Sequence, residues 1–330
     1  MVTKKKWVIT GGCGFIGVTL IRQLLKKNPR AVIRVIDNLT GGDERDLAAV
    51  TQYTRIEAPS PLADNSGIEL VVADIRDAKA MNLHTKGADI ILHLAANTGV
   101  QPSIADPIAD MQANVIGTVN ILEAARANSV NCVILASSGA PIGEATPPLN
   151  EKAPCRPISP YGASKLAGEA YLSAYSGSYG LNTIALRFSN VYGPLSFKKG
   201  SVVAKFIREA FAGKPWHLNG GGLQTRDFIY SEDLAEAILR AAALSDGANL
   251  FQIASGKELA VIDMARILAA ILKEKAGINV TMQASEALMG DVARNFADIS
   301  HAKTKLNWSP LMDLRTGLEK TVNWFQSIQN

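Results

Sequence analysis

Tyr161 and Lys165 stand four residues apart in the run SPYGASK, which spans residues 159–165. Four residues are about one turn of an α-helix, so the phenol and the ammonium group would share one helix face. A positive charge close to a phenol favours the phenolate and is expected to lower the tyrosine pKa from its usual value of about 10. The pair therefore indicates a general base that works near neutral pH.

A glycine-rich turn near the start of the chain indicates a nucleotide site, and so a hydride acceptor beside such a base. Residues 10–17 read TGGCGFIG and lie between a short apolar stretch and a segment with helical spacing, as a pyrophosphate site requires. Gly11 allows the tight turn, Gly14 lets the backbone approach phosphate, and Gly17 lets the helix pack close to the strand. The helix N-terminus would then face the negative charge of a dinucleotide.

Two acidic residues come directly after apolar, β-branched stretches. Asp37 follows residues 31–36 and lies twenty residues after Gly17. A carboxylate there can bond the ribose hydroxyls of adenosine and would repel a 2′-phosphate, which predicts NAD rather than NADP. Asp74 follows residues 69–73, and its carboxylate could either reach the adenine or cap the next helix.

The first half of the chain alternates strand and helix patterns. Strands are expected at residues 7–10, 31–36, 69–73, 89–94, 132–136 and 183–188, and helices at 15–27, 107–128 and 160–178. Continuous apolar strands separated by helices indicate an α/β protein with a parallel sheet covered on both faces. Residues 44–66 are expected to form a helix plus a loop. Residues 141–160 form a proline-rich loop of a length that is usually functional.

Beyond residue 190 the expected elements are smaller and the loops longer. Helices are expected at residues 201–212, 231–243, 261–273 and 314–328, extended segments at 227–230 and 279–283, and a turn at 220–222. Ser231 is the expected N-cap of its helix, with Asp233 in the first turn. This pattern predicts a lid packed on the sheet, an arrangement that forms clefts.

Composition and charge restrict the functional class. The chain has 330 residues, a net charge of +4 and an ordinary hydrophobic content of 47%. Its one basic run, residues 4–6, is interpreted as a solvated lead-in to the first strand rather than a nucleic-acid site. No apolar run has the length of a signal peptide or a membrane span. These features predict a soluble, cytoplasmic protein that binds neither nucleic acid nor membrane.

The cysteines and histidines do not indicate a metal site. Three cysteines at these spacings fit neither a disulfide framework nor a zinc site, and the four histidines lie far apart, namely Cys13, Cys132, Cys155, His84, His93, His217 and His301. We therefore expect no metal and a reducing compartment.

Taken in order along the chain, these motifs resemble the extended short-chain dehydrogenase/reductase family, in its nucleotide-sugar epimerase/dehydratase group. The likeness spans almost the whole chain. It rests on the glycine turn, the tyrosine–lysine run, and the segments DNL (37–39), DI (74–75), HLAA (93–96), NVIGT (114–118), SS (137–138), RFSNVYGP (187–194), QTRDF (224–228) and residues 290–298.

The resemblance implies a Rossmann-type doubly wound parallel sheet with a smaller C-terminal α/β substrate domain. The NAD-binding domain would comprise residues 1–187, with 227–247 packing back on it, and the substrate domain residues 188–330. The helices at 107–128 and 160–178 would pair with those of a second copy, which implies a homodimer. Their small side chains would suit an intramolecular core equally well.

The resemblance also assigns roles by position. Tyr161 would be the base, Lys165 would tune it and hold the nicotinamide ribose, and Ser138 would bond the reacting hydroxyl. The implied NAD-binding residues are Gly11, Gly14, Phe15, Ile16, Gly17, Asp37, Asn38, Asp74, Ile75, Leu94, Ala95, Ala96, Asn114, Ser137, Tyr161 and Lys165. The implied substrate-binding residues are Ser138, Asn190, Ser201, Val202, Arg226, Asp291 and Arg294.

Among the substrate-binding residues, Arg226 would clamp a diphosphate, a task that suits a rigid fork of donors. The adjacent Asp227 would, without the resemblance, make Arg226 half of a surface ion pair. Ser201 and Val202 would lie near the nucleotide base.

Several positions depart from the family pattern. A loop tyrosine is replaced in Pro141-Ile142-Gly143, and Gly139-Ala140 stand where 4,6-dehydratases carry the acids that eliminate water, which disfavours dehydration. Leu288-Met289 stand where many 4-epimerases have a second diphosphate-binding arginine, so either Arg294 substitutes or the clamp has one arginine. Asn295, at a position that restricts sugar size, is intermediate in volume.

The resulting hypothesis is 4-epimerisation of a nucleotide sugar, either UDP-glucose/UDP-galactose or their N-acetyl forms, through a 4-keto intermediate. The alternatives are 4-epimerisation or decarboxylation of UDP-glucuronate, simple NAD-dependent dehydrogenation, and a non-catalytic NAD-binding regulator. The last is disfavoured because Tyr161 and Lys165 are both present.

Overall fold

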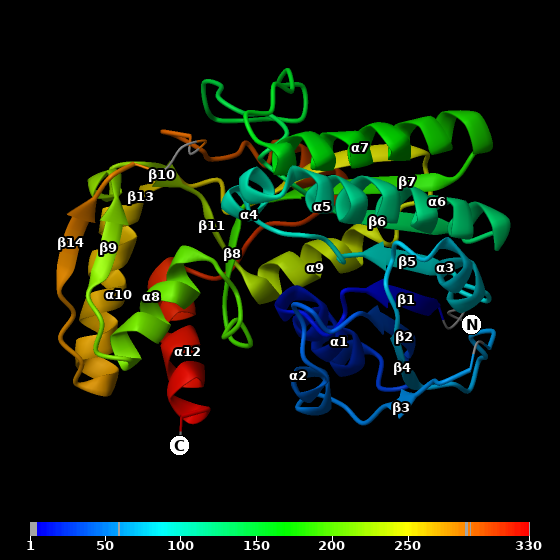
Figure 1. Cartoon of the computed structure of the whole chain (residues 1–330), viewed down its shortest axis with the longest axis horizontal. Coiled ribbons are helices and arrows are strands. Elements are labelled where there is room, and N and C mark those ends of the chain that lie inside the picture. Colours follow the sequence, from blue (N-terminus) through cyan, green and yellow to red (C-terminus); the bar gives the residue numbers. More distant parts are fainter. Residues whose placement is uncertain (1–4, 59, 288–289, 291, 330) are drawn as a thin grey trace.

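The computed structural model describes residues 5–58, 60–287, 290 and 292–329. In this part of the chain eight strands form one sheet in the order β12-β7-β6-β5-β1-β2-β4-β3 (Figure 1). All its strand pairs are parallel. The strands are β1 (Lys6–Thr10), β2 (Val32–Asp37), β3 (Thr54–Arg55), β4 (Ile68–Val72), β5 (Ile90–His93), β6 (Cys132–Ser138), β7 (Asn182–Phe188) and β12 (Ala248–Ile253).

Helices cover both faces of this sheet, because side chains that alternate along each strand are apolar on both sides. Ile9 of β1 belongs to the core beneath α1 (Phe15–Lys27), α2 (Glu44–Ala48), α9 (Ser231–Ala241) and α11 (Ser300–Leu306). The neighbouring Val8 belongs to the core beneath α3 (Ala78–His84), α6 (Gly117–Ala127) and α7 (Pro160–Tyr179) (Figure 1). The predicted doubly wound Rossmann-type sheet is confirmed.

The strand order reverses at β1, which lies between β2 and β5. In open α/β sheets ligands bind in the crevice outside the carboxyl ends of the strands at such a point. The glycine turn follows β1, so the sheet topology places it in that crevice.

A smaller α/β lobe lies beside the sheet, with a core of its own in which the rings of Phe206 and Trp216 stack at 4.6 Å. Its elements are β8 (Asn190–Tyr192), α8 (Val202–Phe211), β9 (Trp216–Asn219), the 3-10 turn η2 (Gly220–Gly222), β10 (Thr225–Arg226), β11 (Phe228–Tyr230), β13 (Leu259–Ala260), α10 (Val261–Ala276), β14 (Met282–Ser285) and α12 (Leu314–Ser327). The predicted domain boundaries stay a prediction. One strand from beyond residue 188, β12, pairs with β7 in the large sheet.

Three expectations need correction. The helix expected at 107–128 is divided into α5 (Pro107–Met111), a π-helical turn η1 (Gln112–Ile116) and α6, and α4 (Val100–Ala105) precedes it. Residues 44–66 contain a strand, β3, as well as a helix. Ser231 is not an N-cap, because Tyr230 holds that position and Ser231 is already helical. Its Oγ is packed beneath Gly193, where a Cβ would lie 2.3 Å from it.

Within the described residues, none of the helices is both long enough and apolar enough to cross a membrane.

Candidate active site

The glycine turn between β1 and α1 is too tightly packed for side chains. Gly11 has φ +68°, and a Cβ there would lie 2.7 Å from the backbone nitrogen of Ala95. A Cβ at Gly17 would lie 2.5 Å from the Cα of Gly12, so α1 rests directly on the turn. The N-cap of α1 is Gly14, which has no side chain to bond the first amides. Those amides are left for an anion.

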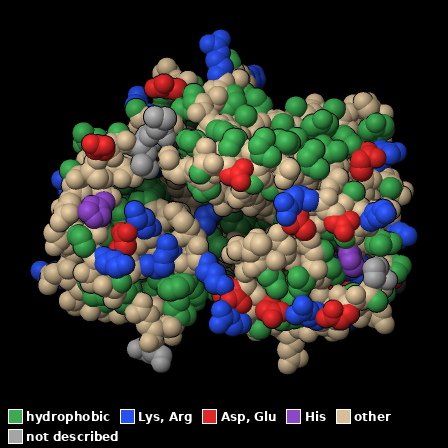
Figure 2. Space-filling model, in the orientation of Figure 1, with side chains coloured by type: hydrophobic (Ala, Val, Ile, Leu, Met, Phe, Trp, Pro, Cys, Tyr) green, Lys and Arg blue, Asp and Glu red, His purple; other side chains and the backbone are tan. Residues whose placement is uncertain are grey.

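This turn forms one wall of a cavity of about 700 Å³. Figure 2 shows the hollow between the two lobes, with Lys and Arg side chains along its border. Among the sequence-predicted residues, those that line it are Gly11, Gly14, Phe15, Ile16, Gly17, Asp37, Asn38, Asp74, Ile75, Leu94, Ala95, Ala96, Ser137, Ser138, Tyr161, Lys165, Asn190 and Ser201. One cavity therefore brings together the turn, both acidic strand ends and the tyrosine–lysine pair.

Asp37 ends β2 at the cavity and is buried. Its carboxylate accepts bonds from the backbone amides of Cys13 and Leu39, each at 2.9 Å. Burial raises the pKa of Asp37, and these two amides oppose the rise because they bond the charged form. The amide of Cys13 belongs to the glycine turn, so Asp37 fixes the turn as well as lining the cavity.

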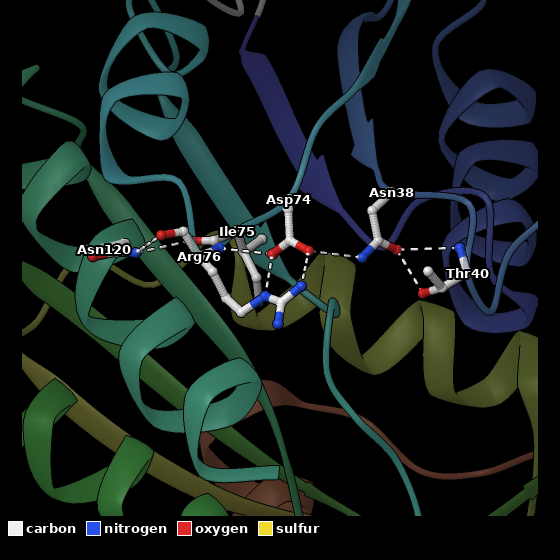
Figure 3. A network of polar contacts seen from close by, with 6 residues as sticks. All are labelled: Asn38, Thr40, Asp74, Ile75, Arg76 and Asn120. Carbon is white, nitrogen blue, oxygen red and sulfur yellow. Dashed lines mark hydrogen bonds and ion pairs between the residues drawn. The ribbon is translucent and has the colours of Figure 1, made fainter. Parts of the chain in front are cut away.

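Asp74 lies across from Asn38 in a polar network at the edge of the cavity (Figure 3). Its carboxylate accepts from Arg76 Nε at 3.0 Å and Nη2 at 2.8 Å, and from Asn38 Nδ2 at 3.1 Å. Asp74 is not the cap of the next helix, because the N-cap of α3 is Asp77. Asp74 does line the cavity, and its contact with the adenine stays a prediction.

The tyrosine–lysine pair stands at the start of α7, close to the end of β6. Tyr161 and Ser138 both line the cavity, and the backbone amide of Tyr161 donates to Ser103 Oγ at 3.0 Å. Lys165 is buried and donates from Nζ to the carbonyl of Ala136 at 3.0 Å. Its Nζ lies 5.8 Å from the centroid of the Tyr161 ring. The side chains of Ser138, Tyr161 and Lys165 thus line one wall of the same cavity.

The expected lowering of the tyrosine pKa is wrong for this arrangement. Burial raises the pKa of Tyr161 to about 12, the Ser138 side chain opposes the rise, and the charge of Asp110 adds to it. Lys165 donates to the carbonyl of Ala136 and makes no hydrogen bond with the phenol within the described residues, and burial lowers its own pKa to about 8. Sequence spacing placed the two groups correctly on one helix face, but it could not reveal the cost of burying their charges.

Two predicted cofactor residues act on the cavity wall. Asn114, in η1, does not line the cavity; it accepts from the amide of Asn97 at 2.8 Å and donates to its carbonyl at 2.9 Å. Asn97 itself lines the cavity. Ser137 lines it too, but its hydroxyl donates to Glu169 at 2.5 Å. Both side chains hold the shape of the wall.

The predicted substrate residues are more scattered. Asn190 lines the cavity and donates to the carbonyl of Asp227 at 3.2 Å, whereas Val202 begins α8 and does not line the cavity. Arg226 donates to the carbonyls of Thr225 and Val292 at 2.7 and 2.8 Å. Asp291, like residues 288–289, lies outside the described residues.

Arg226 and Arg294 are both engaged by protein groups. Arg226 also does not form the surface ion pair with Asp227 that its position in the sequence suggested. Asp227 is fully buried and accepts from Ser255 and Gly256, so it is not the partner of Arg226. Arg294 forms a bidentate pair with Glu258, at 2.7 and 2.8 Å. This engagement weighs against Arg294 as the replacement for a missing arginine.

Sequence reasoning overlooked part of the cavity lining. Additional residues come from the loops after β2, β5 and β8, among them Thr40, Gly41, Gly42, Thr98, Leu195, Lys198, Lys199 and Gly200. Only their closeness to the glycine turn in space marks them, because no local motif does.

The lining fits a dinucleotide. Glycines where a Cβ would collide with backbone, uncapped helix amides and a buried carboxylate at the end of β2 are the groups that bind pyrophosphate and ribose.

The buried His93 is held between Thr10 and Thr118 at 2.7 and 3.2 Å, and burial lowers its pKa to about 3. Within the described residues no cluster of His, Cys, Asp or Glu could hold a metal ion.

Comparison with known proteins places this geometry in context. The model of the NAD dependent epimerase/dehydratase family matches residues 7–254. The UDP-glucose 4-epimerase of Mycolicibacterium smegmatis is 33% identical over 326 residues, which cover 97% of this chain and 98% of that protein.

Solved structures are similar over almost the full length. The UDP-glucose 4-epimerase of Thermotoga maritima with UDP-glucose has a TM-score of 0.87 at 30% identity, covering 98% of this chain and 100% of that one. The UDP-N-acetylglucosamine 4-epimerase of Methanobrevibacter ruminantium M1 in complex with UDP-N-acetylmuramic acid has a TM-score of 0.85 at 31% identity, covering 98% and 99%.

Proposed function

The chain belongs to the NAD dependent epimerase/dehydratase family, and we propose that it inverts carbon 4 of a UDP-sugar with Tyr161 as the base. The family resemblance carried by the sequence motifs is thereby confirmed. The observation that supports the proposal is the Ser138–Tyr161 pair, with Lys165 behind it, in the cavity that also contains the glycine turn. Gly139 and Ala140 follow Ser138 and supply no acid for water elimination.

In the proposed reaction Tyr161 removes the proton from the 4-hydroxyl of the sugar, and Ser138 bonds the oxygen as its charge develops. NAD, when bound, would supply the acceptor and then the donor of the C4 hydride, with the 4-keto sugar turned over between the two transfers. Tyr161 then gives the proton back to the oxygen. No atom is lost or gained, so the enzyme should keep its cofactor through the cycle.

The test is incubation with UDP-glucose, UDP-galactose, UDP-N-acetylglucosamine and UDP-glucuronate, followed by proton NMR of the sugar ring. We expect at least one of these sugars to be converted to a mixture of its C4 epimers, with no NADH released. A pentose product would indicate decarboxylation, and stoichiometric NADH in solution would indicate dehydrogenation; either would contradict the proposal. Conversion of the glucuronate alone would select the uronate alternative.

NAD should bind more tightly than NADP by about a hundredfold, because the 2′-phosphate would meet the Asp37 carboxylate at close range. Calorimetry with the cofactor-stripped protein measures both affinities. Asp37→Asn removes the charge but keeps an acceptor for one backbone amide. The difference between the NAD and NADP affinities should therefore decrease, mainly because NADP binds more tightly. Tighter NADP binding by the wild type would contradict this assignment.

We also propose a homodimer formed by the helices on the α7 side of the sheet. Large apolar side chains on these helices are exposed, namely Ile104, Ile108, Met111, Ile116, Tyr171 and Tyr179. Figure 2 shows hydrophobic side chains gathered over this region of the molecule. Burying such a patch is favourable at roughly 25 cal/mol per Å² of apolar surface.

Ile108→Lys should therefore convert the dimer to a monomer, because Ile108 is 60% exposed on α5 and a lysine would place a charge in the interface. Light scattering after size exclusion measures the mass. Leu311→Lys, at a side chain 90% exposed before α12, is the control and should leave the mass unchanged. A wild-type protein with monomer mass would refute the dimer.

A further inference from the structure

The cavity contains a cation that has no counter-charge. Lys199 lies in the loop between β8 and α8 and lines the cavity with Lys198, Gly200 and Ser201. Within the described ranges, its ammonium group has no hydrogen bond or ion pair with any side chain. Burial lowers the pKa of Lys199, and no carboxylate opposes the shift. Lys199 is half-buried, and an ammonium group that lies in a cavity without a partner is available to an anionic ligand.

The adjacent lysine shows the contrast. The Nζ of Lys198 lies 2.5 Å from a carboxylate oxygen of Asp43, the N-cap of α2. This pair ties the loop to the side of the cavity formed by β2, and it neutralises Lys198. Lys199 follows it in the chain and faces a different environment, because its charge acts on Lys165 and helps to lower the pKa of that residue. Two like charges therefore act on each other within the cavity.

Polar groups next to Lys199 also lack partners. The Oγ of Ser201 is buried and makes no hydrogen bond within the described residues. Ser201 is the N-cap of α8, and its side chain does not bond the amides of the first turn. A helix N-terminus carries a positive partial charge. The hydroxyl and the helix end therefore add to the charge of Lys199.

The other candidate cations are more fully engaged. Arg294 donates from Nε and Nη2 to the carboxylate of Glu258. Arg226 donates from Nη1 to two backbone carbonyls. A nucleoside diphosphate carries at least two negative charges, so a single arginine would leave one of them without a counter-ion.

On these grounds we propose that Lys199 binds the diphosphate of the nucleotide sugar, with Ser201 Oγ and the first amides of α8 completing the anion site. The proposal rests on the function proposed above, since that function supplies the diphosphate. Binding would also screen the repulsion between Lys199 and Lys165. The anion would thus help Lys165 to keep its charge beside Tyr161 when substrate is present.

Calorimetry on the NAD-loaded enzyme tests this, with UDP, uridine and inorganic pyrophosphate as probes. Lys199→Met should weaken UDP and pyrophosphate binding by about 10- to 100-fold, the usual effect of a lost charge-assisted bond. Uridine binding and NAD content should not change. Lys199→Arg should recover most of the affinity. Lys205→Met is the control, because Lys205 lies on α8 with its Nζ 3.7 Å from Glu209 and does not line the cavity.

Unchanged UDP and pyrophosphate affinities in Lys199→Met would overturn the proposal. Loss of NAD in place of UDP would also overturn it, because the lysine would then belong to the cofactor site. Equal weakening of uridine binding would assign the lysine to loop structure. An effect confined to UDP-glucuronate would assign it to a sugar carboxylate. A wild type that binds pyrophosphate but not UDP would contradict the UDP carrier in the proposed function. The pyrophosphate comparison would still decide the role of Lys199.

Discussion

Tyr161→Phe is expected to reduce epimerisation by at least about a thousandfold, as loss of a positioned general base does. The variant removes the only atom of this side chain that can take the sugar proton, while the ring can remain packed in the cavity. NAD should stay bound, because the glycine turn and Asp37 are retained and neither makes a hydrogen bond with the phenol within the described residues. The measurements are NMR rates on the substrate found by the panel and the NAD content of the purified protein.

The matched control is Tyr53→Phe, which removes a phenol that lies 3.4 Å from Glu44 and outside the cavity. Its activity should equal that of the wild type. If Tyr161→Phe retained more than about a tenth of the rate, a different group would have to be the base.

The phenol also has a spectroscopic signature. In the structure without ligands burial raises the pKa of Tyr161 to about 12, so at neutral pH almost every molecule carries the phenol. Deprotonation at neutral pH must therefore depend on positive charge added near the phenol oxygen. Phenolate absorbance can be titrated with pH, and the titration step of Tyr161 is the one that is missing in Tyr161→Phe. This step should occur at lower pH in the NAD-loaded wild type than in the cofactor-free wild type.

Local patterns predicted the elements that line the cavity. The spacing of glycines fixed the turn after β1, and the acidic residues after two apolar stretches lie at the ends of β2 and β4, as expected. Tyr161 and Lys165 fall on consecutive turns of α7. Each of these features depends on a few neighbouring residues, which is why the sequence alone indicates them.

What the sequence could not indicate depends on contacts distant along the chain. β12 takes its place at the sheet edge only by pairing with β7, more than sixty residues away. The pKa of Tyr161 follows from burial and from a lysine that bonds Ala136 instead of the phenol. Arg294 is paired with Glu258, which lies outside the segment 290–298 that suggested a role for Arg294. Tertiary packing decides all three.

A second large effect is expected on α7, at Glu169. Its carboxylate accepts from Arg187 Nε at 2.8 Å and Nη2 at 2.6 Å, and from Ser137 Oγ at 2.5 Å. Both side chains of the ion pair are almost completely buried, with exposed fractions of 9% and 2%. The pair joins α7 to β7, directly behind the wall that contains Ser137 and Ser138.

Glu169→Gln should destabilise the protein by about 3–5 kcal/mol, because it leaves a buried guanidinium without a counter-charge. Urea unfolding of the cofactor-free protein measures the loss. Asp263→Asn is the control: Asp263 pairs with Arg266, with side chains 50% and 68% exposed, and its loss should cost less than about 1 kcal/mol. The double variant Glu169→Met, Arg187→Met should recover much of the stability, since neither charge then remains.

The functional consequence separates this pair from an ordinary structural contact. The charge of Glu169 helps to keep the pKa of Lys165 from falling further, with Asp110 contributing more. Removing it should lower the Lys165 pKa below about 8, so the ammonium near Tyr161 would lose its proton at a lower pH. The pH at which the rate changes should shift downward in both Glu169 variants, including the stable double variant. A restored fold with an unshifted profile would show that Glu169 only holds α7 to the sheet.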